Sequence, residues 1–216
     1  MRTIRAGARV IDAQVATGSE SPSELREVLA RIMGSAPTSA CVLKGGWVDT
    51  PLGPMVAIGD EDALYLLEFF NRRALERQVE RLREKTGSVI VPGVNPPIAC
   101  VERELREYFE GTRKVFHTPI HLLGTTFEER VWTALMKIPS GETRSYGDVA
   151  RAIGQPAAAR AVARANGANR LALIIPCHRV INASGELGGY GGGLARKRWL
   201  IEHEKHGQLP SGDAAN

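Results

Sequence analysis

Apolar residues recur with helical spacing in parts of the chain and form short runs between turn signals in others. In residues 72–87, Leu75, Val79 and Leu82 fall on one face, which predicts an amphipathic helix. The apolar runs around TPLGP and GDED predict a short antiparallel meander, SVIVPG predicts one more strand, and a second helix is predicted to begin after Pro97. Helices that alternate with strands are typical of a small α/β layer, which we expect over residues 39–122.

The pattern of residues 123–207 is mainly helical. Thr125 and Ser145 each precede an acidic residue by three positions, Glu128 and Asp148, which is the spacing of a capping box at a helix start. After a turn with glycine and proline come an alanine-rich helix, an apolar run that we expect to be a strand, and a strand pair around INASGE. This order predicts a winged helix-turn-helix, which the helix LARKRWLIEHEKH closes.

The two ends of the chain carry weaker patterns. Residues 1–38 predict two short helices joined near Gly18, the outline of a helix-turn-helix, and the second helix has its N-cap at Ser21. Residues 208–216 are polar, show no periodicity and predict a disordered tail.

Length and composition indicate an ordinary globular protein, with 216 residues of which 43% are hydrophobic and 24% charged. The apolar stretches are too short to cross a bilayer and the N-terminus has no apolar signal region, so we expect a cytoplasmic protein without a membrane partner. The three cysteines are widely spaced and form no Cys-x-x-Cys pair, which predicts reduced thiols and neither a disulfide framework nor a metal site.

Charge is distributed unevenly along the chain. Residues 1–122 hold 16 basic and 16 acidic side chains, whereas residues 123–207 hold 12 and 7. A basic C-terminal half favours contact with a polyanion such as nucleic acid, although a solvated basic surface gives the same count. The alanine-rich helix carries Arg160 and Arg164 among small side chains, which suits either close packing or close approach to a groove.

Cys177 differs from the other two cysteines in its surroundings. Cys41 and Cys100 are expected to be small buried apolar side chains, as most lone cysteines are. Pro176 ends the expected strand Leu171–Ile175 and therefore places Cys177 at a strand terminus, where a cleft can form.

Positive charge follows Cys177 directly, at His178 and Arg179. Such charge is expected to lower the pKa of the thiol, and a thiolate is a strong nucleophile toward carbon. Adjacent residues of a strand point to opposite faces, so His178 needs a water or a break in the strand to act as the base. A third group, Glu202 or Glu204, is expected to orient the imidazole.

The segments IPCHRVI, RAVARANGAN and GYGGGLARKRWLIEHE together resemble the O6-alkylguanine-DNA alkyltransferases, also called methylated-DNA–protein-cysteine methyltransferases, over about residues 42–206. The resemblance implies a ribonuclease H-like small sheet in the N-terminal α/β domain and a winged helix-turn-helix active-site domain after it. It also implies a monomer that binds double-stranded DNA, turns out O6-alkylguanine, and transfers the alkyl group to a cysteine once, without a cofactor. O4-alkylthymine is a second candidate substrate.

The resemblance implies a role for each matched catalytic residue. Cys177 matches the acceptor thiol, His178 the base that deprotonates it through a water, and Glu204 the acid that orients the histidine. Asn169 matches the asparagine that shapes the turn before the active-site strand. Tyr146 matches the tyrosine that helps to turn out the nucleotide and assists guanine as leaving group.

Contacts with DNA and with the base are implied in the same way. Arg160 matches the arginine that fills the vacated place in the base stack. The residues implied to contact DNA are Tyr146, Ala159, Arg160 and Arg164. The residues implied to wall the base pocket are Pro176, Tyr190, Gly191 and Gly192. Gly191 stands where some members carry a serine that contacts O6, and a wider pocket for bulkier alkyl groups is one consequence of the glycine.

Residues 1–38 resemble a truncated helix-turn-helix of the arabinose-regulator (AraC) class, which the bacterial adaptive-response (Ada) proteins carry before an alkyltransferase domain. This motivates an alternative hypothesis, a DNA-binding transcriptional regulator that alkylation of Cys177 signals. A cysteine hydrolase is a third hypothesis, but it would require an oxyanion hole that the sequence does not indicate.

Overall fold

The computed structural model describes residues 41–206. The predicted helix-turn-helix of residues 1–38 and the predicted tail of residues 208–216 lie outside the described residues, so both stay predictions. The elements of the N-terminal half are β1 (Val42–Val48), β2 (Met55–Gly59), β3 (Leu64–Phe69), α3 (Leu75–Thr86), β4 (Val89–Pro92) and α4 (Pro96–Phe109). The strands form one sheet in the order β3-β2-β1-β4, in which β1, β2 and β3 are antiparallel and β4 is parallel to β1. The predicted antiparallel meander is therefore confirmed.

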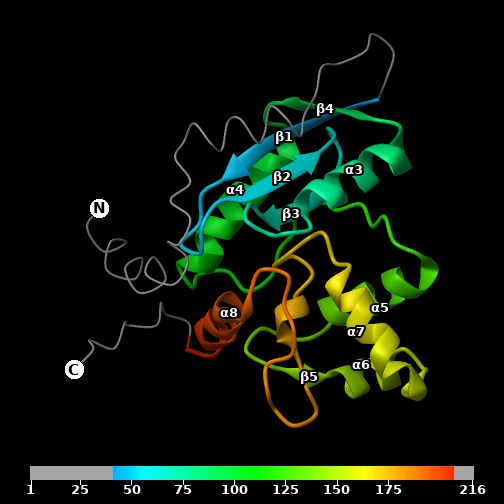
Figure 1. The fold of residues 1–216 in the computed structure, drawn as a ribbon. Helices are drawn as coiled ribbons and strands as arrows, with labels where there is room; N and C mark the ends of the chain where they lie inside the picture. The colour runs from blue at the N-terminus through cyan, green and yellow to red at the C-terminus, as the bar shows by residue number, and fades with distance from the viewer. Residues whose placement is uncertain (1–40, 207–216) are drawn as a thin grey trace.

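Helices cover both faces of this sheet. Side chains of β2 alternate between the faces, so its apolar residues need a covering helix on each side. Val56 and Ile58 belong to a cluster with the apolar side of α3, whereas Met55 and Ala57 belong to the larger cluster that contains α4 (Figure 1). All five residues of β2 are buried, as expected of a central strand with two covered faces.

The C-terminal half is mainly helical, and both predicted capping boxes are formed, at the starts of α5 and α6. Its elements are α5 (Thr126–Met136), β5 (Arg144–Ser145), α6 (Tyr146–Ala152), the 3-10 turn η1 (Pro156–Ala158), α7 (Ala159–Gly167), the 3-10 turn η2 (Cys177–Arg179), β6 (Val180–Ile181) and α8 (Leu194–His206). The alanine-rich helix α7 packs against α5 and α6, which its small side chains allow.

Two strand predictions in this half are wrong. Leu171–Ile175 is buried but is no regular strand, because Leu173 has a left-handed φ of 71° and the segment folds back so that Ala172 bridges Ile175. The expected strand pair around INASGE is also absent, since Val180–Ile181 pairs in parallel with β5 instead. The turn after it closes between Asn182 and Glu186, and the glycines that follow offer few side chains to pack a second strand.

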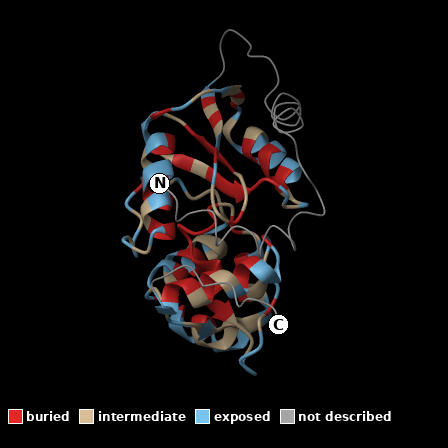
Figure 2. Ribbon diagram, turned by 90° about the vertical axis from the view of Figure 1, so that its left-hand side faces the viewer, coloured by how far each residue is buried: buried red, intermediate tan, exposed pale blue. Residues whose placement is uncertain are grey.

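A continuous apolar core joins the two halves. It contains Leu67 and Phe69 of β3 together with Leu171, Cys177 and Leu200 of the C-terminal half. Figure 2 shows the buried residues running from the sheet into the helices below it. Backbone bonds reinforce this join, because the Leu67 N–H donates to the Arg170 carbonyl and the Ala172 N–H donates to the Leu67 carbonyl, both at 2.8 Å. The segment that leads to Cys177 is thus held by the edge strand of the N-terminal sheet.

No helix within residues 41–206 is long and apolar enough to span a membrane.

Candidate active site around Cys177

Cys177 begins the 3-10 turn η2, and the side chain of Asn169 fixes its position. The Asn169 Nδ2 group lies 3.2 Å from the Cys177 Sγ and donates to the Ile175 carbonyl at 3.0 Å. The Asn169 Oδ1 atom accepts from the Leu171 N–H at 2.9 Å. One buried amide therefore ties the turn before the folded-back segment to the thiol after it, and this contact supports the shaping role implied for Asn169.

The pKa of the Cys177 thiol is raised to about 11, because burial opposes the thiolate more than the Asn169 amide favours it. This overturns the expectation that the adjacent His178 and Arg179 lower the pKa. The guanidinium of Arg179 donates to Glu204 and to the Ile138 carbonyl. Its charge is therefore neutralised by Glu204 and does not stabilise the thiolate. The resting thiol is protonated and needs a base when it reacts.

His178, the residue after Cys177, forms a buried pair with Glu204. The His178 Nε2 atom lies 2.8 Å from the Glu204 Oε1 atom, and the imidazole is fully buried. Although burial opposes it, the combined hydrogen bonds and charges of His178 and Arg179 hold the pKa of Glu204 well below its usual range. An ionised Glu204 can only accept, so the imidazole proton is assigned to Nε2 and the lone pair to Nδ1. Burial also lowers the pKa of His178, which keeps the ring neutral.

The Nδ1 atom of His178 is buried and has no hydrogen-bond partner among the described residues. A lone pair without a partner at this place can receive the thiol proton through a water. Glu202, the alternative orienting acid, instead forms ion pairs with Lys205 and His206 at the surface. Of the two candidate glutamates, Glu204 is therefore the one that contacts the imidazole of His178.

Tyr108 is a member of this network that no sequence motif indicates. Its hydroxyl donates to the Glu204 Oε1 atom at 2.8 Å, from α4 in the N-terminal half. The Gly141 N–H donates to the Glu204 Oε2 atom at 3.2 Å. An aromatic residue near the end of an amphipathic helix gives no sequence signal of this role, because ordinary core tyrosines have the same pattern.

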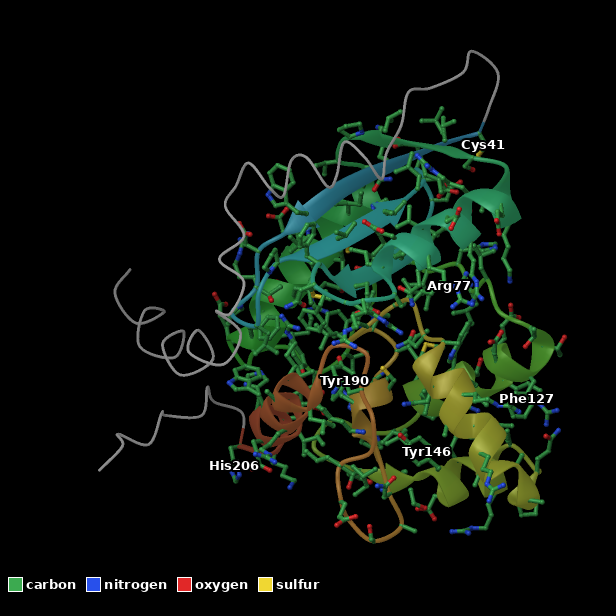
Figure 3. The ribbon with its side chains drawn as sticks, viewed as in Figure 1. Cys41, Arg77, Phe127, Tyr146, Tyr190 and His206 are labelled. Carbon is green, nitrogen blue, oxygen red and sulfur yellow. The ribbon has the colours of Figure 1, made fainter. Side chains whose placement is uncertain are left out.

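A cavity of about 320 Å³ opens against the Cys177 side chain. It is lined by Glu68, Arg72, Tyr146, Ala163, Asn166, Gly167, Ala172, Cys177, Gly189, Tyr190, Gly191 and Gly192. Tyr190, Gly191 and Gly192 of the predicted base pocket line this cavity, whereas Pro176, the fourth predicted pocket residue, is buried and does not. Tyr146, which the resemblance assigns to assisting the leaving base, also lines it. Figure 3 shows Tyr190 and Tyr146 in the C-terminal half, between α8 and α7. The Tyr190 hydroxyl is buried without a partner among the described residues, which leaves it available to a molecule in the cavity.

Arg72 and Glu68, which no sequence motif indicates either, form one wall of the cavity. Arg72 pairs with the buried Glu68 and donates to the Asn169 carbonyl at 3.0 Å and to the Gly167 carbonyl at 2.7 Å. A Cβ atom added at Gly191 would lie 2.6 Å from the Cζ atom of Arg72. The guanidinium therefore occupies space next to the glycine, and the absence of a side chain at position 191 does not by itself widen the cavity.

Gly188 and Gly192 of the same loop are also closely packed, whereas Gly189 is open. A Cβ atom at Gly192 would lie 2.8 Å from the rings of Phe69 and Tyr190. Two cations of α8 hold the loop from behind: Arg196 donates to the Gly192 carbonyl at 2.9 Å, and the buried Lys197 donates to the Gly188 carbonyl at 3.1 Å. The glycine-rich segment is thus a fixed wall.

Gly191→Ser is expected to lower the free energy of unfolding by about 1–3 kcal/mol, the usual cost of overpacking, because it displaces Arg72 from Glu68. The same substitution in an Arg72→Ala background should cost clearly less. Urea unfolding of the four proteins in this cycle measures the coupling. Gly189→Ser is the control, because a Cβ atom there meets nothing within 4 Å. An equal cost of Gly191→Ser in both backgrounds would contradict the contact.

The residues predicted to contact DNA lie on α6 and α7. Arg160 and Arg164 are exposed on α7, Ala159 is half-buried at its start, and Tyr146 is half-buried at the start of α6. Further along α7, three residues line the active-site cavity: Ala163, Asn166 and Gly167. The same helix therefore presents arginines to solvent and forms a wall of the site.

The other cysteines do not share these surroundings. Cys41 is exposed and Cys100 is half-buried, so the prediction that both are small buried apolar side chains is wrong. Within residues 41–206, no group of three or more His, Cys, Asp and Glu side chains is placed to hold a metal ion.

Known proteins resemble this chain in sequence and in fold. Residues 126–206 match the family model described as 6-O-methylguanine DNA methyltransferase, DNA binding domain. The chain is 44% identical to the methylated-DNA–protein-cysteine methyltransferase of Mycobacterium leprae over 164 residues, which cover 76% of this chain and 93% of that protein. It is 40% identical to the protein of the same name from Shigella flexneri, with 73% and 92% covered.

Solved structures give the same picture. The crystal structure of OGT from Mycobacterium tuberculosis in complex with DNA superposes with a TM-score of 0.66 at 42% identity, and the match covers 78% of this chain and 95% of that one. The mixed sheet and the helices described above follow the fold of that protein.

Proposed function

Because this chain belongs to the family of methylated-DNA–protein-cysteine methyltransferases, we propose that Cys177 takes an alkyl group directly from the O6 atom of a guanine in double-stranded DNA. One observation carries the assignment of the acceptor: the Cys177 side chain borders a cavity of about 320 Å³, and the next residue, His178, is paired with Glu204. This volume lies at the lower end of the range of about 300–1,000 Å³ that is usual for ligand sites.

The finer description of the fold is part of the proposal. We interpret the four-stranded sheet with α3 and α4 as a ribonuclease H-like domain. We interpret α5, α6 and α7 with the loop after β6 as a winged helix-turn-helix, in which α7 is the helix that enters a groove of DNA. The predicted boundary between the two domains, near residue 122, fits this interpretation.

The transfer begins with the thiol proton. The proton of the Cys177 Sγ atom passes to the Nδ1 atom of His178, through a water, and Glu204 stabilises the imidazolium that forms. The thiolate then attacks the alkyl carbon, the new S–C bond forms as the C–O6 bond breaks, and the electron pair of that bond goes to the guanine. Because the pKa of the thiol is raised to about 11, the thiolate is a strong nucleophile once it has been formed.

The tyrosines are placed to assist the departing base. Tyr146 lines the cavity, and burial, with a contribution from Cys177, raises the pKa of its hydroxyl, so it keeps its proton to donate. The departing guanine gains negative charge when it takes the C–O6 electron pair, and a donor that protonates a ring nitrogen lets it leave as a neutral base. Tyr190 lies at the same cavity and can stack on the base.

The base reaches this site by leaving the duplex. The exposed Arg160 at the start of α7 can fill the vacated place in the stack and so offset part of the few kcal/mol that extrusion costs. The thioether that results has no easy reverse reaction and leaves Cys177 blocked. We therefore propose that each monomer acts once and that the chemistry needs no cofactor.

Intact-mass measurement after mixing the protein with duplex DNA that contains O6-methylguanine tests this proposal. We expect a gain of one methyl group per chain, located in the peptide of Cys177, and no gain with unmodified DNA. Cys41 and Cys100 are internal controls that should remain unmodified. An unchanged mass with intact DNA binding would overturn the transfer, and repeated turnover of excess DNA would overturn single use.

The alternative regulator hypothesis depends on residues 1–38, which lie outside the described residues. The relatives that match are named as methyltransferases, and the matches cover 76% and 73% of this chain, which does not favour the regulator.

A further inference from the structure

A second cavity, of about 270 Å³, lies where α3 of the N-terminal half meets α5 and α7 of the C-terminal half. Five arginines line it: Arg72, Arg77, Arg81, Arg164 and Arg170. Figure 3 shows Arg77 on the side of α3 that faces the C-terminal half. The cavity adjoins the active-site cavity, because Arg72 and Gly167 line both. We call this second cavity the arginine cavity.

Most of the positive charge of the arginine cavity is not neutralised within the described part of the chain. Arg77, Arg81 and Arg164 are exposed and have no ion-pair or hydrogen-bond partner among residues 41–206. Arg170 is half-buried and donates to the Leu123 carbonyl at 3.3 Å. Burial lowers the pKa of Arg170, and the negative charge of Glu128 opposes this shift. The positive charge of Arg81 lowers the pKa of Arg170 further, because the two like charges repel each other.

The remaining charges of the arginine cavity do not remove this excess. Arg72 is paired with Glu68, so it contributes no net charge. Glu128 is the one carboxylate that lines the cavity, and it accepts from the backbone and hydroxyl of Thr125 in the capping box. Four unneutralised arginines against one glutamate are arranged to receive an anion, and guanidinium groups match phosphate oxygens with paired hydrogen bonds.

We propose that the arginine cavity binds a backbone phosphate of the DNA next to the extruded nucleotide. This inference rests on the proposed function, in which α7 lies against DNA, and extends the interface to α3. Arg164 lies four residues after Arg160, so both project from one side of α7. The shared wall at Gly167 places the phosphate site beside the entrance for the base. Residues 1–122 contain equal numbers of basic and acidic residues, so the overall charge count does not indicate this basic patch on α3.

The test is the salt dependence of DNA binding by an Arg77→Gln/Arg81→Gln double variant. Binding of a fluorescent undamaged duplex is measured by anisotropy at several KCl concentrations. The matched control is Arg103→Gln/Arg106→Gln, which removes the same charge from exposed positions of α4, on the opposite face of the sheet. We expect the slope of log K against log[salt] to become shallower by about 1 in the α3 variant and to stay unchanged in the control. Binding of the α3 variant at the lowest salt should weaken about tenfold or more.

Two further readouts separate the possible outcomes. Equal slopes for the α3 variant and the control, with methyl transfer intact, would overturn the phosphate site but not the proposed function. Failure of methyl transfer in the wild type, with a shallower slope in the α3 variant, would overturn the function but support the site. Thermal stabilisation by inorganic phosphate that the α3 variant loses, without any change in its DNA slope, would show a site for free phosphate and would count against the DNA contact.

Discussion

Replacing Cys177 by serine is expected to abolish methyl transfer to the protein, with a rate reduction of about 10⁴-fold or more, as removal of a catalytic nucleophile produces in other enzymes. The reason is chemical rather than structural. A serine hydroxyl has nearly the shape of the thiol and can still accept from the Asn169 Nδ2 group, but it is a far weaker nucleophile toward an alkyl carbon. The measurement is the time course of intact mass after addition of DNA containing O6-methylguanine.

The fold and the DNA affinity of the serine variant should stay close to those of the wild type. Cys177 is 6% exposed and its contacts are compatible with an oxygen atom, so we expect the free energy of unfolding to change by less than about 1.5 kcal/mol. Cys100→Ser is the control, because this half-buried thiol lies outside the site and its loss should not alter transfer. Transfer to the Cys177→Ser protein at the wild-type rate would contradict the assignment of the acceptor.

Much of the helical structure could be predicted because its causes are local. The capping boxes at Thr125 and Ser145 are set by residues three positions apart, and both form as expected. The amphipathic helix with Leu75, Val79 and Leu82 is likewise found, and these three side chains are buried on one face. Patterns of this kind depend on a few neighbouring residues and can therefore be predicted from a single sequence.

The path of the chain into the site could not be predicted in the same way. An apolar run such as Leu171–Ile175 is typical of a buried strand. Its backbone hydrogen bonds instead join Ala172 to Leu67 and Ile175 to Leu171 within the same segment. The pKa of Cys177 was predicted in the wrong direction for a related reason. Sequence adjacency places Arg179 beside the thiol, whereas the fold turns its guanidinium toward Glu204, 25 positions further along the chain.

The supporting residues of the site come from distant parts of the sequence. Tyr108 reaches Glu204 across 96 positions, and Arg72 reaches the Asn169 carbonyl across 97. Neither residue belongs to a local motif, and each has an ordinary structural interpretation within its own helix or turn. The proposed acceptor, base and acid belong to a motif that can be recognised in the sequence, whereas these partners required the tertiary structure.

Replacing Glu204 by glutamine is expected to destabilise the protein and to slow transfer together. The carboxylate receives Arg179, His178, Tyr108 and the Gly141 N–H, so its loss leaves the buried guanidinium of Arg179 without a counter-charge. Removal of one partner of a buried ion pair typically costs about 3–5 kcal/mol, which urea unfolding at pH 7 can measure. Glu202→Gln is the matched control, because this glutamate pairs only at the surface and should change stability by less than about 1 kcal/mol.

The effect of Glu204→Gln on transfer should exceed its effect on binding. A neutral amide stabilises the imidazolium of His178 less than a carboxylate does, so we expect the rate with saturating DNA to fall by about 10²-fold or more. Because the variant is less stable, the rate is compared under conditions in which unfolding curves show both proteins to be folded. A wild-type rate in the folded variant would remove Glu204 from the proposed proton transfer and leave it a structural residue.

The pH dependence of stability gives this substitution a signature of its own. The pKa of Glu204 is depressed in the folded protein, so its contribution to stability is fully present above the unfolded value of 4.5 and is lost as the pH falls toward the folded value. The difference in unfolding free energy between wild type and Glu204→Gln should therefore be constant from about pH 7 to pH 5 and shrink below about pH 4.5. A difference that stays constant to pH 3 would mean that the carboxylate is not held ionised by its partners.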